Sequence, residues 1–168
     1  MLSDIALKLE NAGADCVLIG CNTAHLIADE LKQKIHIPLL HIAKETAKEI
    51  MHHKIRKVGL IGTKFTMENS FFTEHLAAAG IETIIPEMND RDIIHDAILN
   101  EFSKGIFIEE TKKKYLQIID KLQQNGADAI IFGCTEISLL ITQADCSLQI
   151  FDTTAIHAKA AADFALSN

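Results

Sequence analysis

Residues 121–134 read KLQQNGADAIIFGC, and residues 8–21 read KLENAGADCVLIGC. The two stretches are offset by 113 residues along their whole length, and seven of the fourteen positions are identical. Each reads as the end of a helix, a glycine turn, a short apolar strand and a final Gly-Cys pair. The repeat predicts two similar halves, each of which presents one thiol, Cys21 or Cys134, at the end of a strand.

Short apolar runs alternate with longer helical patterns along the chain, which is typical of βα units and a parallel sheet. We expect strands at 16–19, 37–41, 58–61, 82–85, 129–132 and 148–151. We expect helices at 3–11, 24–34, 43–53, 68–79, 90–103, 109–124, 137–142 and 154–166. Gly13, Gly80 and Gly126 each stand between a helix and a strand, where a glycine commonly ends a helix.

The composition is that of an ordinary globular protein, with 168 residues, 48% hydrophobic and 23% charged. The net charge of −7 argues against nucleic acid or an anionic membrane as the main partner. No apolar run reaches the roughly 18 residues that a membrane span needs, and the first residues do not read as a signal peptide. The four cysteines do not predict a disulfide framework. We therefore expect a cytoplasmic protein.

A short polar stretch follows each Gly-Cys pair, and a predicted helix follows that stretch. Asn22, Thr23 and Thr135 are residue types favoured at helix N-caps. The positive end of a helix dipole favours thiolate and lowers the pKa of a neighbouring thiol, and free N–H groups there bind carboxylates. Each strand end therefore combines a reactive thiol with a carboxylate-binding turn, at the edge where parallel sheets bind ligands.

Three kinds of chemistry are compatible with the two thiols. A metal site could use Cys21, His25 and Cys134, but the closely spaced ligand pairs of common metal motifs are absent. A cysteine hydrolase could use His25 as its base, but Cys134 would then have no role. Two thiols that face one α-carbon could instead invert it, because one thiolate removes the proton while the other thiol delivers a proton to the opposite face. We favour this third interpretation.

The two thiol motifs resemble the paired signatures of the aspartate/glutamate racemase family, which works without pyridoxal phosphate. They read GCNTAH at 20–25 and GCTEI at 133–137. Residues 58–68 and 151–158 resemble the middle and closing segments of the same family, so the resemblance covers essentially the whole chain. It implies an α/β protein with two pseudo-symmetric, flavodoxin-like parallel-sheet lobes and a site in the cleft between them. Residues 1–53 with 153–168 would form the first lobe, and residues 54–152 the second.

The resemblance also implies roles for individual residues. Cys21 and Cys134 would be the catalytic acid/base pair, and no cofactor or metal is expected. The substrate-binding candidates are Asn22, Thr23 and Thr135 for the α-carboxylate, with Glu136, Lys104 and Thr63 nearby. Glu136 stands where glutamate racemases usually carry histidine, which favours the aspartate racemase branch. Lys104 would lie near the side-chain carboxylate of the substrate, or would only complement a helix dipole, and Thr63 would touch substrate or cap a helix.

The expected function is the racemisation of a small amino-acid substrate, most simply aspartate, by a homodimer. Family members begin with a strand–helix–strand unit that precedes the segment corresponding to Met1 of this sequence, so we expect an N-terminally truncated first lobe. Two alternatives stay open: an inactive remnant that binds or oligomerises, and a cysteine-dependent isomerase or decarboxylase of a small diacid.

Overall fold

A four-stranded parallel sheet forms the centre of the structure, a computed structural model that describes residues 1–167. The strand order is β4-β3-β5-β6, and β3 and β5 are the inner strands. The strands are β3 (Lys57–Gly62), β4 (Glu82–Ile84), β5 (Ala129–Gly133) and β6 (Gln149–Asp152). All four were expected from the sequence, with ends displaced by one residue at most.

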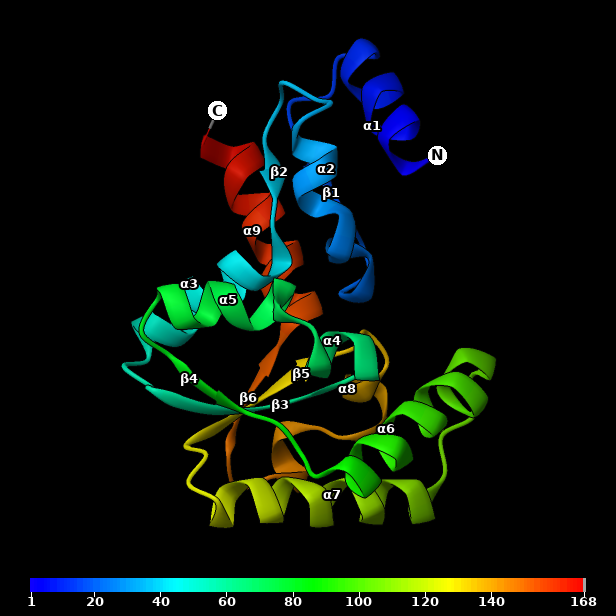
Figure 1. Ribbon diagram of the computed structural model, residues 1–168, viewed down its shortest axis with the longest axis vertical. Helices are drawn as coiled ribbons and strands as arrows, with labels where there is room; N and C mark the ends of the chain where they lie inside the picture. The colour runs from blue at the N-terminus through cyan, green and yellow to red at the C-terminus, as the bar shows by residue number, and fades with distance from the viewer. Residues whose placement is uncertain (168) are drawn as a thin grey trace.

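Helices cover both faces of this sheet (Figure 1). One face packs against α6 (Met88–Asn100), α7 (Glu109–Gln124) and α8 (Ile137–Leu140), and the other against α3 (Ile42–His52) and α5 (Ser70–Ala78). Alternate residues of β5 point to opposite faces, with Ile130 and Phe132 in one core and Ala129 and Ile131 in the other. Because both faces are buried, the strand is apolar throughout, which is why it is so clear in the sequence.

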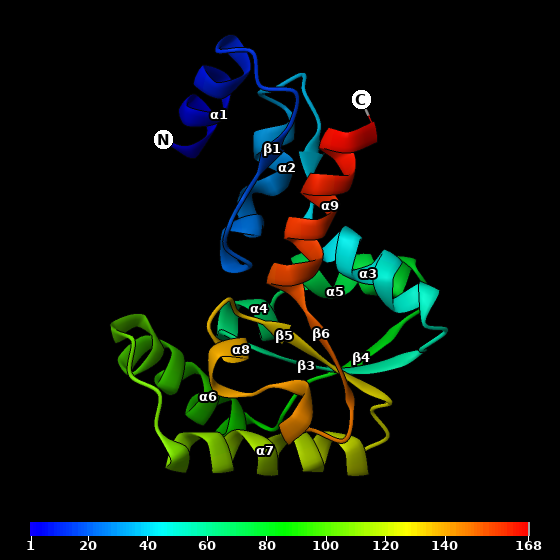
Figure 2. The same ribbon diagram turned by 180° about the vertical axis from the view of Figure 1, so that it is seen from behind.

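A second, two-stranded parallel sheet lies apart from the first (Figures 1 and 2). Its strands are β1 (Val17–Leu18) and β2 (Leu39–Leu40), and the helices beside it are α1 (Leu2–Asn11) and α2 (Ala28–Lys32). Its buried core is small and consists of Ala6, Val17, Leu31 and Ile35. Both strands are shorter than expected, since a two-stranded parallel pair gains few hydrogen bonds and buries little apolar surface.

Helix α9 (Thr153–Ser167) joins the two parts. It begins directly after β6 and runs along β2 and α3 (Figure 2). The α/β fold with parallel sheets is thus confirmed, as are the glycine helix ends, because Gly13, Gly80 and Gly126 have φ of 90°, 72° and 93°. None of the helices within residues 1–167 is long and apolar enough to cross a bilayer.

Two expected helices are divided in the structure. The helix expected at 24–34 begins as a 3₁₀ helix, η1 (Thr23–Ile27), and continues as α2. The helix expected at 68–79 corresponds to α4 (Lys64–Glu68) and α5, which are separated by an extended residue, Asn69. Two further 3₁₀ turns, η2 (Phe102–Lys104) and η3 (Gln143–Asp145), follow α6 and α8.

Candidate active site

Cys134 follows the last residue of β5 and is 7% exposed. The strand end before it is closely packed, because Gly62 of β3 lies opposite Gly133 of β5. A Cβ added to Gly62 would stand 2.8 Å from the carbonyl oxygen of Gly133, which is closer than real Cβ contacts. The two glycines let the strands end side by side, one residue before the thiol of Cys134.

Cys21 lies in the loop between β1 and η1, and its side chain is exposed. The loop contacts the end of β3 through three threonines: the hydroxyl of Thr23 lies 2.8 Å from that of Thr63 and 3.3 Å from that of Thr66. Since Thr63 follows the glycine that pairs with Gly133, these contacts bring the Cys21 loop to the strand end that carries Cys134. The charge of Cys21 contributes to the raised pKa of Cys134, so each thiol is within electrostatic reach of the other.

Glu136 is the immediate polar partner of Cys134. The thiol donates a hydrogen bond to Oε2 of Glu136, at 3.0 Å. Burial raises the pKa of the Cys134 thiol, and this hydrogen bond and the carboxylate charge raise it further, to about 12. Burial also acts to raise the pKa of Glu136, but hydrogen bonds from Cys134 and Thr135 outweigh it, so that pKa lies below its ordinary value.

The expectation that a helix N-terminus lowers the pKa of both thiols is therefore wrong for Cys134. The helix after it, α8, is only one turn long, and the residue at its N-cap is Glu136, not Thr135. Neither α8 nor η1 receives a side-chain capping bond, although Asn22 does occupy the N-cap of η1. Burial and a neighbouring carboxylate decide the protonation of Cys134, because a single turn contributes little dipole.

Asn22 links the two parts of the molecule. It is 3% exposed, and its Nδ2 donates to Oγ1 of Thr153 at 2.9 Å, while that hydroxyl donates to the carbonyl oxygen of Phe132 at 2.8 Å. The other amide atom, Oδ1, is buried without a hydrogen-bond partner among the described residues. Thr153 was not a candidate from the sequence, although its place at the carboxyl end of β6 could have indicated it.

His25 is buried, and both of its ring nitrogens are engaged. Its Nδ1 lies 2.9 Å from the carbonyl oxygen of Cys21, and its Nε2 accepts the backbone N–H of Ile42 at 3.2 Å. Neither nitrogen is free to take a proton from a thiol, which argues against the hydrolase interpretation. The same engagement leaves His25 unsuited to the metal site considered above, and no group of three potential ligands for a metal occurs within residues 1–167.

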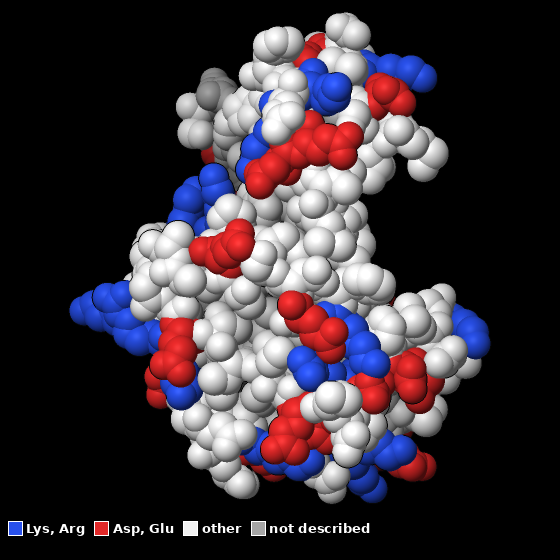
Figure 3. Space-filling view, in the orientation of Figure 1, with Lys and Arg blue, Asp and Glu red and all other residues white. Residues whose placement is uncertain are grey.

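Lys104 lies on η2, at the end of α6, and is exposed. No hydrogen bond or ion pair within the described part of the chain involves its side chain. Figure 3 shows the molecule hollowed on one side, between the part formed by α1, α2 and η1 and the part formed by α6, with a largely uncharged surface around the hollow. A separate cavity of about 570 Å³ lies between α3 and α9, and neither thiol lines it.

Comparison with known proteins gives a consistent result. Residues 1–161 match the model of the Asp/Glu/hydantoin racemase family. The chain is 29% identical over 156 residues to the broad specificity amino-acid racemase RacX of Bacillus subtilis, covering 93% of this chain and 67% of that protein.

Two solved structures are similar over 98% of this chain and 72% of their own length. One is the crystal structure of a proposed Asp/Glu racemase from Yersinia pestis, with 45% identity and a TM-score of 0.93. The other is an aspartate racemase homologue from Pyrococcus horikoshii, with 32% identity and a TM-score of 0.87. The chain thus spans about two thirds to three quarters of the length of these relatives.

Proposed function

Because the chain belongs to the Asp/Glu/hydantoin racemase family, we propose that it racemises an acidic amino acid, most simply aspartate, with Cys21 and Cys134 as the two acid/base residues. The thiols alone carry out the proton transfers in this proposal, without a cofactor. The observation that carries it is the convergence of two Gly-Cys strand ends, from two separate sheets, through the contact between Thr23 and Thr63.

The two thiols differ in burial and in their polar partners. Cys134 is buried, hydrogen-bonded to Glu136, and has a pKa of about 12, so it carries its proton at neutral pH. It is the natural donor to a carbanion formed at the α-carbon. Cys21 is exposed and would remove the α-proton from the opposite side of the substrate. For the reverse reaction the roles exchange, and Cys134 must lose its proton first.

Substrate recognition would use the polar groups around the thiols. We assign the α-carboxylate to the loops that carry Thr23, Thr63 and Thr135, which supply hydroxyl and backbone donors. Asn22, directly after Cys21, stays a candidate for the same carboxylate. The free ammonium of Lys104 would approach the side-chain carboxylate across the hollow.

We propose aspartate as the substrate for two reasons. The Pyrococcus horikoshii relative, at 32% identity, is an aspartate racemase homologue. In addition, Glu136 stands at the position where glutamate racemases usually carry histidine. A broader substrate range is the second candidate, because the chain also resembles the broad specificity racemase RacX. We further propose a cytoplasmic location, in line with the four free cysteines of the described chain, and a homodimeric assembly.

Incubation with L-aspartate in deuterated buffer tests the proposal. We expect D-aspartate with deuterium at the α-carbon, because the proton delivered to the opposite face comes from a thiol that exchanges with solvent. Parallel incubations with L-glutamate and with neutral amino acids separate a narrow from a broad substrate range. A folded protein that exchanges no α-proton from any of these substrates would refute the proposal.

Single serine variants test the assignment of the thiols. Cys21→Ser and Cys134→Ser should each lower the racemisation rate by about 100-fold or more, because each removes one acid/base group. Cys146→Ser is the matched control: it alters a half-buried thiol outside the site and should retain the wild-type rate. Full activity in either of the first two variants would contradict a two-thiol mechanism.

A further inference from the structure

Four histidine rings form a continuous column between the two parts of the molecule. His157 of α9 lies 5.7 Å from His25 of η1, His25 lies 4.7 Å from His41, and His41 lies 4.2 Å from His75 of α5, measured between ring centroids. His25, His41 and His157 are buried, and His75 is half-buried. The proposed function gives none of these rings a role, although one of them contacts the Cys21 loop directly.

The hydrogen bonds of His25 determine its tautomer. The N–H of Ile42 donates to Nε2, so Nε2 carries no proton. A neutral imidazole must then carry its proton on Nδ1, which lies 2.9 Å from the carbonyl oxygen of Cys21 and donates to it. A protonated ring would place a second N–H against the N–H of Ile42 and lose that bond. The geometry therefore requires the neutral Nδ1–H form.

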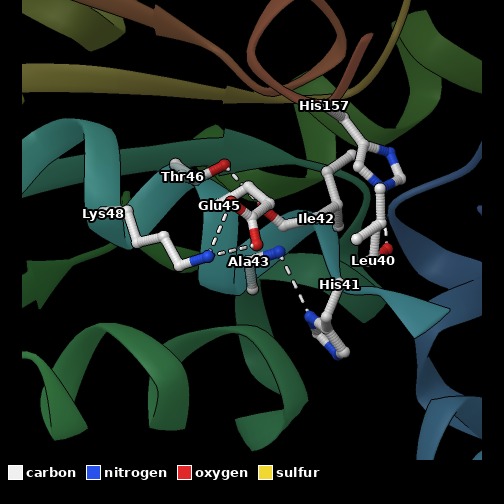
Figure 4. Close-up of polar contacts among 8 residues, drawn as sticks. All are labelled: Leu40, His41, Ile42, Ala43, Glu45, Thr46, Lys48 and His157. Atoms are coloured by element: carbon white, nitrogen blue, oxygen red, sulfur yellow. Dashed lines mark hydrogen bonds and ion pairs between the residues drawn. The ribbon is translucent and has the colours of Figure 1, made fainter. Parts of the chain in front are cut away.

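The neighbouring rings hold His25 in this position. His41 caps α3, because its Nδ1 accepts the N–H of Ala43 at 3.2 Å, and Nε2 of His157 lies 2.8 Å from the carbonyl oxygen of Leu40 (Figure 4). His41 and His157 are thus each fixed to the segment that leads from β2 into α3. His25 lies between them and connects that segment to Cys21.

The charges around the column also favour the neutral form. Burial lowers the pKa of His25 to about 4, and the neighbouring His157 and the Lys32 ammonium of α2 contribute, although the bond to the Cys21 carbonyl acts in the opposite direction. Lys44 of α3 faces His41 and His75. Among the charges that act on His25, His41 and His75 within the described residues, the carboxylates are Asp29 of α2 and Glu74 of α5, and both act on the half-buried His75.

The loop before η1 has few other restraints at Cys21. A Cβ placed on Gly20 would meet no atom within 4 Å, so the backbone on that side is not packed against the rest of the molecule. No side-chain hydrogen bond of the Cys21 thiol occurs within the described residues. On the other side, Asn22 is held by Thr153. The carbonyl of Cys21 thus depends on the His25 ring for its orientation.

We propose that His25 is a positioning residue that orients Cys21 through its backbone carbonyl, and that it does so only as the neutral Nδ1–H tautomer. The consequence for catalysis rests on the proposed function of Cys21. The tautomer of His25 and the restraint of the loop do not rest on that function, and both can be measured without substrate.

Nuclear magnetic resonance of the full chain labelled with ¹⁵N-histidine gives the first test. Two-bond ¹⁵N–¹H correlations at neutral pH should show His25 protonated on Nδ1 alone, with its signals identified by their loss in His25→Asn. An Nε2–H tautomer, or a charged ring at neutral pH, would overturn the proposal.

Amide hydrogen exchange gives the second test, with three variants. His25→Phe removes both bonds, His25→Asn keeps a donor near the place of Nδ1, and His75→Gln alters the column at the end away from Cys21. Exchange in the peptide that contains residues 20–25 should rise about tenfold in His25→Phe, the effect of losing one hydrogen bond. It should rise less in His25→Asn and stay unchanged in His75→Gln. Unchanged exchange in a folded His25→Phe would refute the restraint of the Cys21 loop by His25. If that variant does not fold, the tautomer measurement and the exchange of His25→Asn still test the proposal.

Racemisation kinetics give the third test. A displaced Cys21 thiol should lower kcat by about 100-fold in His25→Phe, with KM little changed and with partial recovery in His25→Asn. A folded His25→Phe with wild-type kcat, or a loss that lies in KM alone, would contradict the proposal. A wild-type protein that does not racemise would refute the function instead, and the first two tests would still decide the role of His25.

Discussion

At the scale of single residues, the pair of Cys134 and Glu136 shows how little of a side chain's chemistry follows from its type. A thiol at a strand end near a helix was expected to have a lowered pKa. Burial and a carboxylate at 3.0 Å have the opposite effect, and the thiol keeps its proton. A buried thiol that keeps its proton is available as a donor, whereas the nearby carboxylate opposes the thiolate that donation leaves behind.

Glu136→Gln should lower the pKa of the Cys134 thiol. The carboxylate raises that pKa both as a hydrogen-bond acceptor and as a negative charge, and a hydrogen bond to a charged group is worth about one pKa unit or more. Alkylation of Cys134, followed by peptide mass spectrometry as a function of pH, measures the shift. Glu110→Gln, on an exposed residue of α7, is the control and should leave the profile unchanged. A pKa that stays at about 12 in Glu136→Gln would show that burial alone accounts for the raised value.

At the scale of elements, the two Gly-Cys motifs are not equivalent. Gly133 ends a five-residue strand that is buried along its whole length, and its partner Gly62 has no space for a side chain. Gly20 follows a two-residue strand, and a Cβ there would meet open space. The same Gly-Cys pair therefore lies at a closely packed strand end in one sheet and in a loosely packed loop beside the other.

Gly62→Ala should destabilise the protein, because the new methyl group would lie 2.8 Å from a backbone carbonyl oxygen that cannot easily move. We expect a loss of about 1–3 kcal/mol in the free energy of unfolding, measured by urea denaturation. Gly20→Ala is the matched control, with an expected change within about 0.5 kcal/mol. Equal effects of the two substitutions would argue against the closely packed end of β3 and β5.

At the scale of the whole molecule, the two sheets are joined by polar contacts as well as by α9. The three threonines, the bond from Asn22 to Thr153 and the histidine column all lie where the parts meet. Buried histidines at such a junction make its stability depend on pH, because the folded chain resists their protonation. The division into 1–53 with 153–168 and 54–152 stays a prediction, and Asn168 lies outside the described residues.

Acidification should destabilise the protein between about pH 6.5 and pH 3. Burial lowers the pKa of His41 to about 3 and that of His25 to about 4, while unfolded histidine titrates near 6.5. In this window the unfolded chain binds protons that the folded chain does not, so the free energy of unfolding falls with pH by up to about 1.4 kcal/mol per unit for each histidine. Below about pH 3 these two groups add no further loss.

Urea denaturation across that pH range measures the slope. His41→Asn keeps a side-chain acceptor suited to the N-cap of α3 but removes the titrating ring, so it should flatten the pH dependence. His36→Gln alters an exposed ring and should keep the wild-type slope. If His41→Asn also keeps that slope, His41 does not contribute to it.

Much of the architecture was predictable because it rests on local patterns. Buried strands such as 129–132 are apolar on both faces, and glycines such as Gly126 end helices at positive φ, so both are visible in sequence. The lengths of the strands in the small sheet were overestimated. The apolar runs there are longer than the two residue pairs that hydrogen-bond within the described chain. Of the site, the sequence indicated Cys21, Cys134 and the threonines that follow β1 and β3, but not Thr153 or the bond between His25 and Ile42.

By itself, then, the sequence determined the succession of βα units and the placing of one thiol at the end of each of two strands, because both depend on short-range periodicity and on glycine turns. The tertiary structure alone decided what surrounds those thiols. Burial beside Glu136 gives Cys134 its raised pKa, and the backbone N–H of Ile42 at the start of α3 engages the second nitrogen of the His25 ring, which contacts the Cys21 carbonyl through its first. Glu136 and His25 are close in the chain to the cysteines they contact. The burial of Cys134 and the bond from Ile42 to His25 depend instead on how distant segments pack, so no local pattern could specify them.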